Sequence, residues 1–335
     1  LEGPQQLIRA TADKVLADEY DGWPAGRASE ISITSSQLTE ASGHWDDATI
    51  WIAPSENQSW QFGFVGPVLE HSKGAGGGTI RATIYTEPQS FFHLHDRSTR
   101  FYLFDCQAAL DAAGEWYRDP VTNRLYVHLE PGQTPDDRMI EMRRRDLAFD
   151  LDDRRWITIA DLDIVAATIS TDADLGDGDV YGHSTNNGGR ATGSIASAEQ
   201  ITIDGIHASY VSHFVGTTGW YQSQWYDISG ILLSGTNHTI QNSTVMHSAG
   251  NGVMLWGRGH RVLNNFISDT QYVLSRGGGV CMPTRSAWDM EVGYNTIVRS
   301  GWTAVDSDEC QVDFHHNLVD GYSLMGHDSG GTHFV

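Results

Sequence analysis

The sequence predicts an all-β protein in which a small N-terminal β domain precedes a right-handed parallel β-helix. Three observations lead to this prediction: short β-branched runs that each end in Asn, Asp or Gly, a polar landmark that recurs, and a glycine landmark that recurs with it. We place the N-terminal domain at residues 1–150 and the β-helix at residues 151–335.

The N-terminal domain is predicted to be a sandwich or barrel of strands with one short helix. Its strand-like runs are Thr49–Ala53, residues 79–85 and residues 100–104, which polar turn clusters separate. Residues 5–20 favour a helix, because their apolar side chains recur at spacings of three and four. We expect a flexible loop at residues 73–78, where a lysine precedes the glycines and no phosphate-binding pattern follows.

The repeat begins after Trp156 and has the pattern apolar-x-x-polar-x-apolar. Its polar position falls at residues 204, 243, 265, 295 and 317, and a glycine before a short strand falls at residues 230, 252, 279, 301 and 331. The polar position follows the glycine at a nearly constant distance, and both recur every ~22–30 residues. This pattern is typical of parallel coils that stack at about 4.8 Å. Leucine is too sparse for a leucine-rich repeat, and the period is too short for a propeller blade. We expect Asn265, Asn295 and Asn317 to stack as a ladder of amides.

The charge balance excludes some classes of partner. The chain of 335 residues has 43 acidic and 21 basic residues, a net charge of −22, which would repel nucleic acid. No apolar run approaches the ~20 residues that a membrane helix needs. An acidic, lysine-poor surface favours an extracellular or periplasmic location. Because the sequence stops at the start of a coil, we expect missing C-terminal coils or a second chain to cover that edge.

Two acidic clusters could hydrolyse a glycosidic bond, a reaction that needs two carboxyl groups. The first comprises Asp306, Asp308 and Glu309, and the second is His327-Asp328 before the last predicted strand. On a strand, Asp306 and Asp308 would share one face about 6.6 Å apart, which suits inversion. Counting from the glycine landmarks places Asp306 and Asp328 at opposite ends of one sheet, so we do not expect them to form one pair.

We assign Asp328 first, then Asp306 and Asp308, as catalytic carboxylates, with His327 orienting a neighbouring acid. The predicted substrate-binding residues are Trp256, Arg276, His333 and Glu309. Trp256 follows an alternating strand at an outward position and would be a sugar platform, whereas Trp302 falls at an inward position and is expected in the core. A lyase would need a base and a cation; without a lysine in the repeat, the candidates are Arg276, Arg258 and Arg285 with His260 or His333.

No cofactor is needed for this hydrolysis. One acidic segment, Asp172, Asp174, Asp177 and Asp179, places oxygen donors around a glycine and could bind Ca²⁺. Its spacing does not match an EF-hand, and a solvated acidic loop is the alternative reading.

Three segments resemble a known group of proteins. Residues 110–119, LDAAGEWYRD, followed by LYV at 125–127, resemble the LDAPGEWY…LYV segment of bacterial right-handed parallel β-helix proteins, a group that contains glycoside hydrolases and is related to polysaccharide lyases. Residues 150–159 resemble their first coil, and residues 316–331 resemble their HN-IYD…DGGGIY coil.

The resemblance implies a catalytic role for Asp328, at the DGGG-like position, and a second acid about one coil later. This sequence reads Asp-Ser-Gly-Gly there and ends seven residues on. The resemblance also implies that Glu115 and Trp116 are structural. The sequence as a whole therefore favours a glycoside hydrolase that acts on a polysaccharide or oligosaccharide. The alternatives are a polysaccharide lyase that cleaves a uronate polymer and a non-catalytic carbohydrate-binding or adhesin module.

Overall fold

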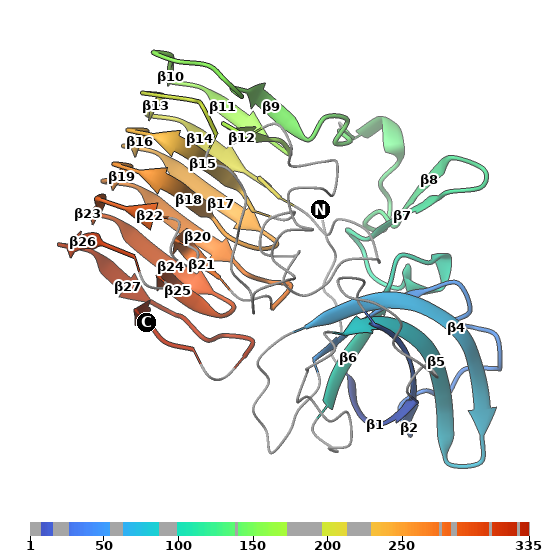
Figure 1. The fold of residues 1–335 in the computed structure, drawn as a ribbon. Helices are drawn as coiled ribbons and strands as arrows, with labels where there is room; N and C mark the ends of the chain where they lie inside the picture. Colours follow the sequence, from blue (N-terminus) through green and yellow to red (C-terminus); the bar gives the residue numbers. More distant parts are fainter. Residues whose placement is uncertain are drawn as a thin grey trace. The chain divides into compact units, whose positions relative to one another are not determined.

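The computed structural model describes residues 8–15, 27–53, 63–86, 99–137, 140–172, 196–212, 229–274, 277–282, 287–307, 310–326 and 329–334. The fold is all-β, and the chain divides into two compact units with the main boundary between Met142 and Arg143 (Figure 1). The helical elements among these residues are two short 3₁₀ turns, η1 (Gln107–Ala109) and η2 (Pro135–Asp137). In the same ranges no helix has the length and hydropathy to cross a bilayer.

The first unit contains a closed antiparallel barrel. Its strands follow the order β1-β2-β5-β4-β3-β6, and a separate hairpin pairs β7 with β8. The barrel strands are β1 (Ile8–Val15), β2 (Arg27–Ser35), β3 (Thr49–Ala53), β4 (Phe64–Gly74), β5 (Gly77–Thr86) and β6 (Thr99–Phe104); the hairpin strands are β7 (Trp116–Asp119) and β8 (Arg124–Val127). Alternate residues such as Ile31, Ile33, Ile80 and Ile84 are fully buried. Closure leaves the six strands without a free edge.

Two local predictions in this unit are wrong. Residues 8–15 form a strand rather than a helix, because β1 pairs with both β2 and β6 and so completes the barrel. Residues 73–78 form a tight hairpin rather than a flexible loop. There Gly77 has a φ of +135°, and a Cβ on it would lie 2.2 Å from the carbonyl oxygen of Ser35, so only glycine fits this turn.

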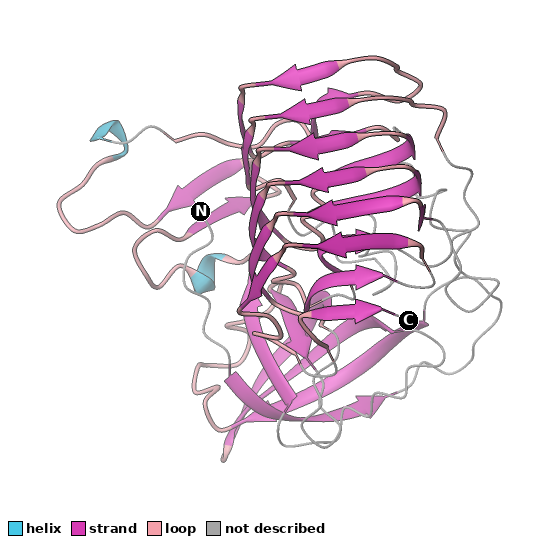
Figure 2. Ribbon diagram, turned by 90° about the vertical axis from the view of Figure 1, so that its left-hand side faces the viewer, coloured by secondary structure: helices cyan, strands magenta, loops and turns pink. Residues whose placement is uncertain are grey.

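The second unit is a β-solenoid of three parallel sheets (Figure 2). Sheet 1 comprises β9 (Leu147–Asp150), β12 (Thr168–Ser170), β15 (Ile231–Thr236), β18 (Val253–Arg258), β21 (Gly278–Met282), β25 (Thr303–Ser307) and β28 (Thr332–Phe334), with β22 (Ala287–Trp288) also paired to β18. Sheet 2 comprises β10 (Thr158–Ala160), β13 (Thr202–Asp204), β16 (Thr239–Gln241), β19 (Arg261–Leu263), β23 (Met290–Gly293) and β26 (Val312–His315). Sheet 3 comprises β11 (Asp163–Val165), β14 (His207–Ser209), β17 (Thr244–Ser248), β20 (Phe266–Thr270), β24 (Thr296–Ser300) and β27 (Leu318–Asp320). The predicted parallel β-helix is therefore confirmed as a fold.

The core of the solenoid consists of aliphatic columns. Ile203, Ile240, Val262 and Val292 are partners in consecutive strands of sheet 2, and none of them exposes any surface. Each coil stacks the same kind of side chain on the coil before it. The interior is therefore a continuous hydrophobic column that fixes the register of the outward-facing residues.

The predicted amide ladder is present at the corner between sheets 2 and 3. The backbone N–H and side-chain N–H of Asn265 donate to Oδ1 of Asn295 at 2.9 and 3.0 Å, and Asn295 makes the same two bonds to Asn317 at 2.9 and 3.0 Å. Ser243 extends the column, since its backbone N–H donates to Oδ1 of Asn265. Buried turn groups are thus satisfied by side chains.

Two landmarks in the predicted repeat are out of register. The pairing of β14 with β17 aligns Ser243 with Ile206 rather than with Asp204, because Ile203, not Ile201, is the partner of Ile240. Asp204 instead lies on the outer face, where amides of Gln241 and Asn242 donate to its carboxylate at 2.8 Å and lower its pKa.

The glycine landmark at Gly301 is also wrong. Val305 pairs with Val280 and with Thr332, so Ala304 is the residue that aligns with Gly279 and Gly331. This shift of three residues moves Asp306 along sheet 1, away from the end where the sequence count placed it.

Candidate functional site

The outer face of sheet 1 brings two of the candidate residues together. Asp306 on β25 and His333 on β28 are direct partners in adjacent strands, and Nδ1 of His333 lies 2.7 Å from Oδ1 of Asp306. Asp306 is only 3% exposed, whereas the imidazole above it is about one-third exposed. Val305, the residue before Asp306, packs in the core. Because side chains alternate along a strand, Asp306 points outward, and so does its strand partner His333.

This pair has a defined chemical arrangement. With an ionised Asp306, the hydrogen bond requires that Nδ1 of His333 carry the proton. Trp302, buried as predicted, lies edge-on to the imidazole at a centroid distance of 6.0 Å. Cys281 is the partner of Asp306 on the other neighbouring strand. A buried carboxylate that orients a more exposed imidazole is suited to proton transfer.

Several predicted site residues lie outside the described residues. They are Asp308, Glu309, His327 and Asp328, together with Arg276 and Arg285. The sequence places Asp308 directly after β25 and Asp328 four residues before β28, so both adjoin the strands that carry Asp306 and His333. Their catalytic and binding roles stay predictions.

Trp256 occupies an outward position of β18, between the inward Leu255 and Gly257. Its side chain is nevertheless only 9% exposed, so most of the ring surface is covered. Burial of this kind does not support stacking on a sugar, and the platform role of Trp256 stays a prediction.

One proposed lyase base is wrong. His260 is fully buried and stacks on His238 at a ring distance of 4.8 Å, inside the corner between sheets 1 and 2. Its Nε2 donates to the carbonyl of Trp256, and its Nδ1 accepts from the backbone N–H of His238. Burial, and secondarily the neighbouring His238, lower its pKa to about 3. His260 is therefore a neutral structural residue that no substrate can reach.

Arg258, a second lyase candidate, already has a partner. Its Nη2 and Nε both lie 2.7 Å from Oδ2 of Asp289 on the exposed side of the solenoid. This ion pair lies at the corner between sheets 1 and 2.

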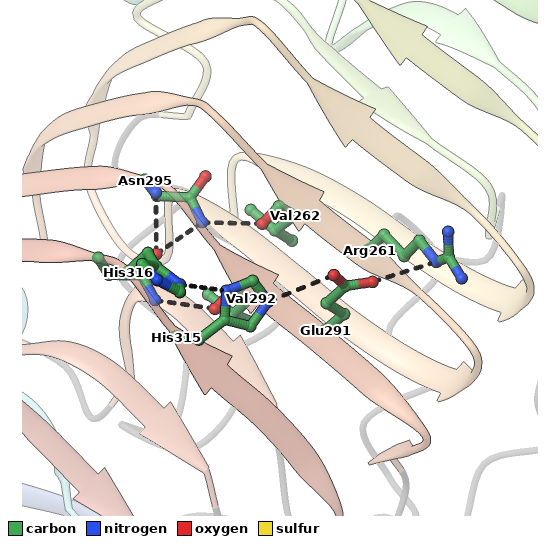
Figure 3. A network of polar contacts seen from close by, with 8 residues as sticks. Arg261, Val262, Glu291, Val292, Asn295, His315 and His316 are labelled. Atoms are coloured by element: carbon green, nitrogen blue, oxygen red, sulfur yellow. Dashed lines mark hydrogen bonds and ion pairs between the residues drawn. The ribbon is translucent and has the colours of Figure 1, made fainter.

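A polar network on sheet 2 and at its end is shown in Figure 3. Arg261 contacts Glu291 at 3.4 Å, and the other oxygen of Glu291 lies 3.3 Å from Nε2 of His315. The Nδ1 atoms of His315 and His316 are 3.0 Å apart, so one of them donates to the other. Tyr294 stacks on His316 at a centroid distance of 4.8 Å. These residues were not among the predicted site residues, although the alternation from Met290 to Gly293 marks Glu291 as outward-facing.

The predicted calcium segment is described only at Asp172. Its backbone carbonyl accepts from Oγ of Ser170 at 2.6 Å. Asp174, Asp177 and Asp179 lie outside the described residues. Within the described ranges, no group of three or more His, Cys, Asp or Glu side chains could hold a metal ion.

The comparisons with known proteins agree with the fold. No protein-family model and no curated protein matches the chain. A solved structure titled "Glycoside hydrolase" is similar to it, with a TM-score of 0.55 and 13% sequence identity. The match covers 100% of this chain and 66% of that chain, so this chain spans about two-thirds of that protein. At this identity the likeness shows a shared fold.

Proposed function

We propose that this protein is a glycoside hydrolase that acts on a polysaccharide or oligosaccharide at the outer face of sheet 1. The observation that carries the proposal is the buried, outward-facing carboxylate of Asp306, which accepts a hydrogen bond from His333 of the adjacent strand at 2.7 Å. A rigid wall of parallel strands suits a polymer substrate, because it presents side chains at a fixed spacing. An extracellular or periplasmic location would give access to such a polymer.

Hydrolysis needs a carboxylic acid that protonates the leaving oxygen and a second carboxylate that acts as nucleophile or base. We assign Asp306 to the ionised role, since His333 donates to it and holds its orientation. Asp328 is the first candidate for the acid and Asp308 the second, because both adjoin the strands of this pair. His327 and Glu309 would contact the same substrate region.

The test is a panel of polysaccharides with mass spectrometry of the products. Hydrolysis adds the mass of water to the products, and the Asp306→Asn variant should lose about 10²–10⁴-fold in turnover. Asp320→Asn, an exposed carboxylate on sheet 3, is the matched control and should keep wild-type turnover. Wild-type turnover in Asp306→Asn, with the fold confirmed by circular dichroism, would remove Asp306 from the mechanism.

A polysaccharide lyase is the second candidate, and the partly exposed His333 favours it. An imidazole that a carboxylate orients is a suitable base to abstract the proton beside a uronate carboxylate. Elimination produces an unsaturated uronate that absorbs in the ultraviolet, whereas hydrolysis does not. A product with this absorbance, lost in His333→Gln, would replace the hydrolase proposal. Binding of a glycan without any product would favour a non-catalytic module.

A further inference from the structure

A second polar surface lies at the corner between sheets 1 and 2. It forms a groove of about 1000 Å³, and its lining includes Gln200, Thr239, Arg261, Glu291 and Asp313. Thr239, Arg261, Glu291 and Asp313 are partners in four consecutive strands of sheet 2. From the coil of Gln200 to that of Asp313 there are four steps of about 4.8 Å, so the groove is about 19 Å long. This length suits an oligomer rather than a single sugar.

The backbone of the corner is built to hold such a surface. Gln200, Asn237, Gly259 and Asp289 follow one another in successive coils, all with φ between 53° and 73°. The backbone N–H groups of Gln200, Asn237 and Gly259 donate across the coils, to the carbonyl oxygens of Thr236, Arg258 and Trp288 respectively. The groove floor is therefore a rigid column rather than a loop.

The charged groups in the groove are held in place before any ligand arrives. Asp289 is fixed by Arg258 at 2.7 Å, and Glu291 lies between Arg261 at 3.4 Å and His315 at 3.3 Å. Planar amide, guanidinium and carboxylate groups can each make paired hydrogen bonds, which match the neighbouring hydroxyl groups of a sugar. Preorganisation of these side chains lowers the entropic cost of binding.

Exposed tryptophans flank the groove. Trp288 is the strand partner of Arg258 and is 43% exposed, and Trp156, which precedes Gln200 in the corner column, is 69% exposed. An indole ring gives a sugar ring an apolar face with a polar edge.

We propose that this groove binds an uncharged oligosaccharide segment of the polymer, at a place separate from the Asp306–His333 pair. The proposal rests on the proposed function for the carbohydrate nature of the ligand. Two arginines and three carboxylates line the groove, Arg258, Arg261, Asp289, Glu291 and Asp313, which gives a formal charge of 2 − 3 = −1. With the overall charge of −22, this disfavours a polyuronate or a phosphate polymer.

Calorimetric titration tests the proposal with hexasaccharides of cellulose, xylan and mannan as uncharged probes and of polygalacturonate as the charged one. At least one uncharged probe should bind, and Trp288→Ala and Arg258→Ala should each weaken that binding at least tenfold. Trp116→Ala removes a tryptophan of similar exposure in the first unit, and Arg299→Ala removes an arginine paired with Asp269 at 2.6 Å on sheet 3. Both controls should bind as the wild type does.

The Asp306→Asn variant separates the two proposals. If both are right, it loses turnover but keeps the affinity for the probe. If no polymer is hydrolysed but the groove variants still lose affinity, the hydrolase proposal fails and the groove stands. Unchanged affinity in both groove variants, tighter binding of polygalacturonate, or no binding of any uncharged probe would overturn the groove proposal whatever the activity.

Discussion

The two corners of the solenoid that flank sheet 2 solve the same problem with different side chains. Between sheets 2 and 3, Oδ1 of Asn295 accepts from the backbone N–H of Asn265, and its amide donates to the carbonyl of Val262. Between sheets 1 and 2, Nδ1 of His260 accepts from the backbone N–H of His238, and its Nε2 donates to the carbonyl of Trp256. An imidazole can thus replace an amide in a ladder, but only the imidazole titrates.

Because the described residues contain stacked histidines only at the corner between sheets 1 and 2, we expect this corner to make the folding stability depend on pH. Burial lowers the pKa of His238 from 6.5 to about 4 and that of His260 to about 3. Below pH 6.5 the unfolded chain binds protons that the native chain does not, so stability is complete above pH 6.5 and falls as the pH drops toward these values. His238 alone accounts for a loss of about 3 kcal/mol near pH 4.

Urea unfolding at pH 7 and pH 4.5 measures this effect, the largest that we expect. The double variant His238→Gln/His260→Gln should lose less stability between the two pH values than the wild type. Carboxylates with lowered pKa values, such as Asp204 and Asp269, contribute equally to both proteins and cancel in the difference. Equal losses in the two proteins would show that the histidine ladder is not the acid-sensitive corner.

The amide corner should respond to truncation instead. In Asn295→Ala, the backbone N–H of Asn265 and the carbonyl of Val262 lose their buried partners, which should cost about 3 kcal/mol in unfolding free energy. The matched control is Asn264→Gly, an exposed amide beside the ladder whose left-handed φ of 53° glycine accepts. We expect the control to change stability by about 0.5 kcal/mol or less in urea titrations. A small effect of Asn295→Ala would mean that water replaces the amide.

The residues with positive φ at the corner between sheets 1 and 2 are tested at Gly259, which has a φ of +73°. Gly259→Ala should destabilise the protein by about 1–2 kcal/mol, and Gly259→Asn by less, because asparagine tolerates this conformation. Both new side chains meet Oδ1 of Asn237 at their Cβ, so the difference between the variants isolates the backbone strain. Equal thermal unfolding temperatures for the two variants would contradict this explanation.

The smallest effect on stability is expected for the exposed ion pair at the corner between sheets 1 and 2. Arg258→Ala removes an exposed ion pair with Asp289 and should change the unfolding free energy by less than about 1 kcal/mol. Thermal unfolding of the pure variant is the measurement. A larger loss would mean that Arg258 stabilises the corner, and the loss of glycan affinity in this variant could then not be assigned to direct contact.

The sequence was sufficient for the fold because the repeat is dictated by simple physics. Aliphatic residues must face inward in every coil, and Asn265, Asn295 and Asn317 can satisfy buried turns only when they stack. Residues 8–15 show the limit of this reasoning. Their small and apolar side chains fit both a helical and an alternating pattern, and the decision comes from strands β2 and β6, which no local pattern reveals.

The candidate site was harder to predict, because it depends on register and on burial. A glycine at position 301 resembled the landmark, but Val305 pairs with Val280, and this moved Asp306 beside His333. The outward direction of Trp256 follows from alternation, yet its side chain is only 9% exposed, which alternation does not predict. The groove combines residues from separate coils that are ordinary surface charges when read one at a time.

The third corner of the solenoid, between sheets 3 and 1, joins its strands by connections of very different length. Strand β14 ends at Ser209 and β15 begins at Ile231, whereas β17 ends at Ser248 and β18 begins at Val253. The stacking of coils is the same on either side of both connections. Since the entropic cost of a longer connection grows only slowly, new segments can be inserted here while the walls keep their alignment. An engineer who wants to alter what this scaffold recognises should therefore graft at this corner and leave the ladders untouched.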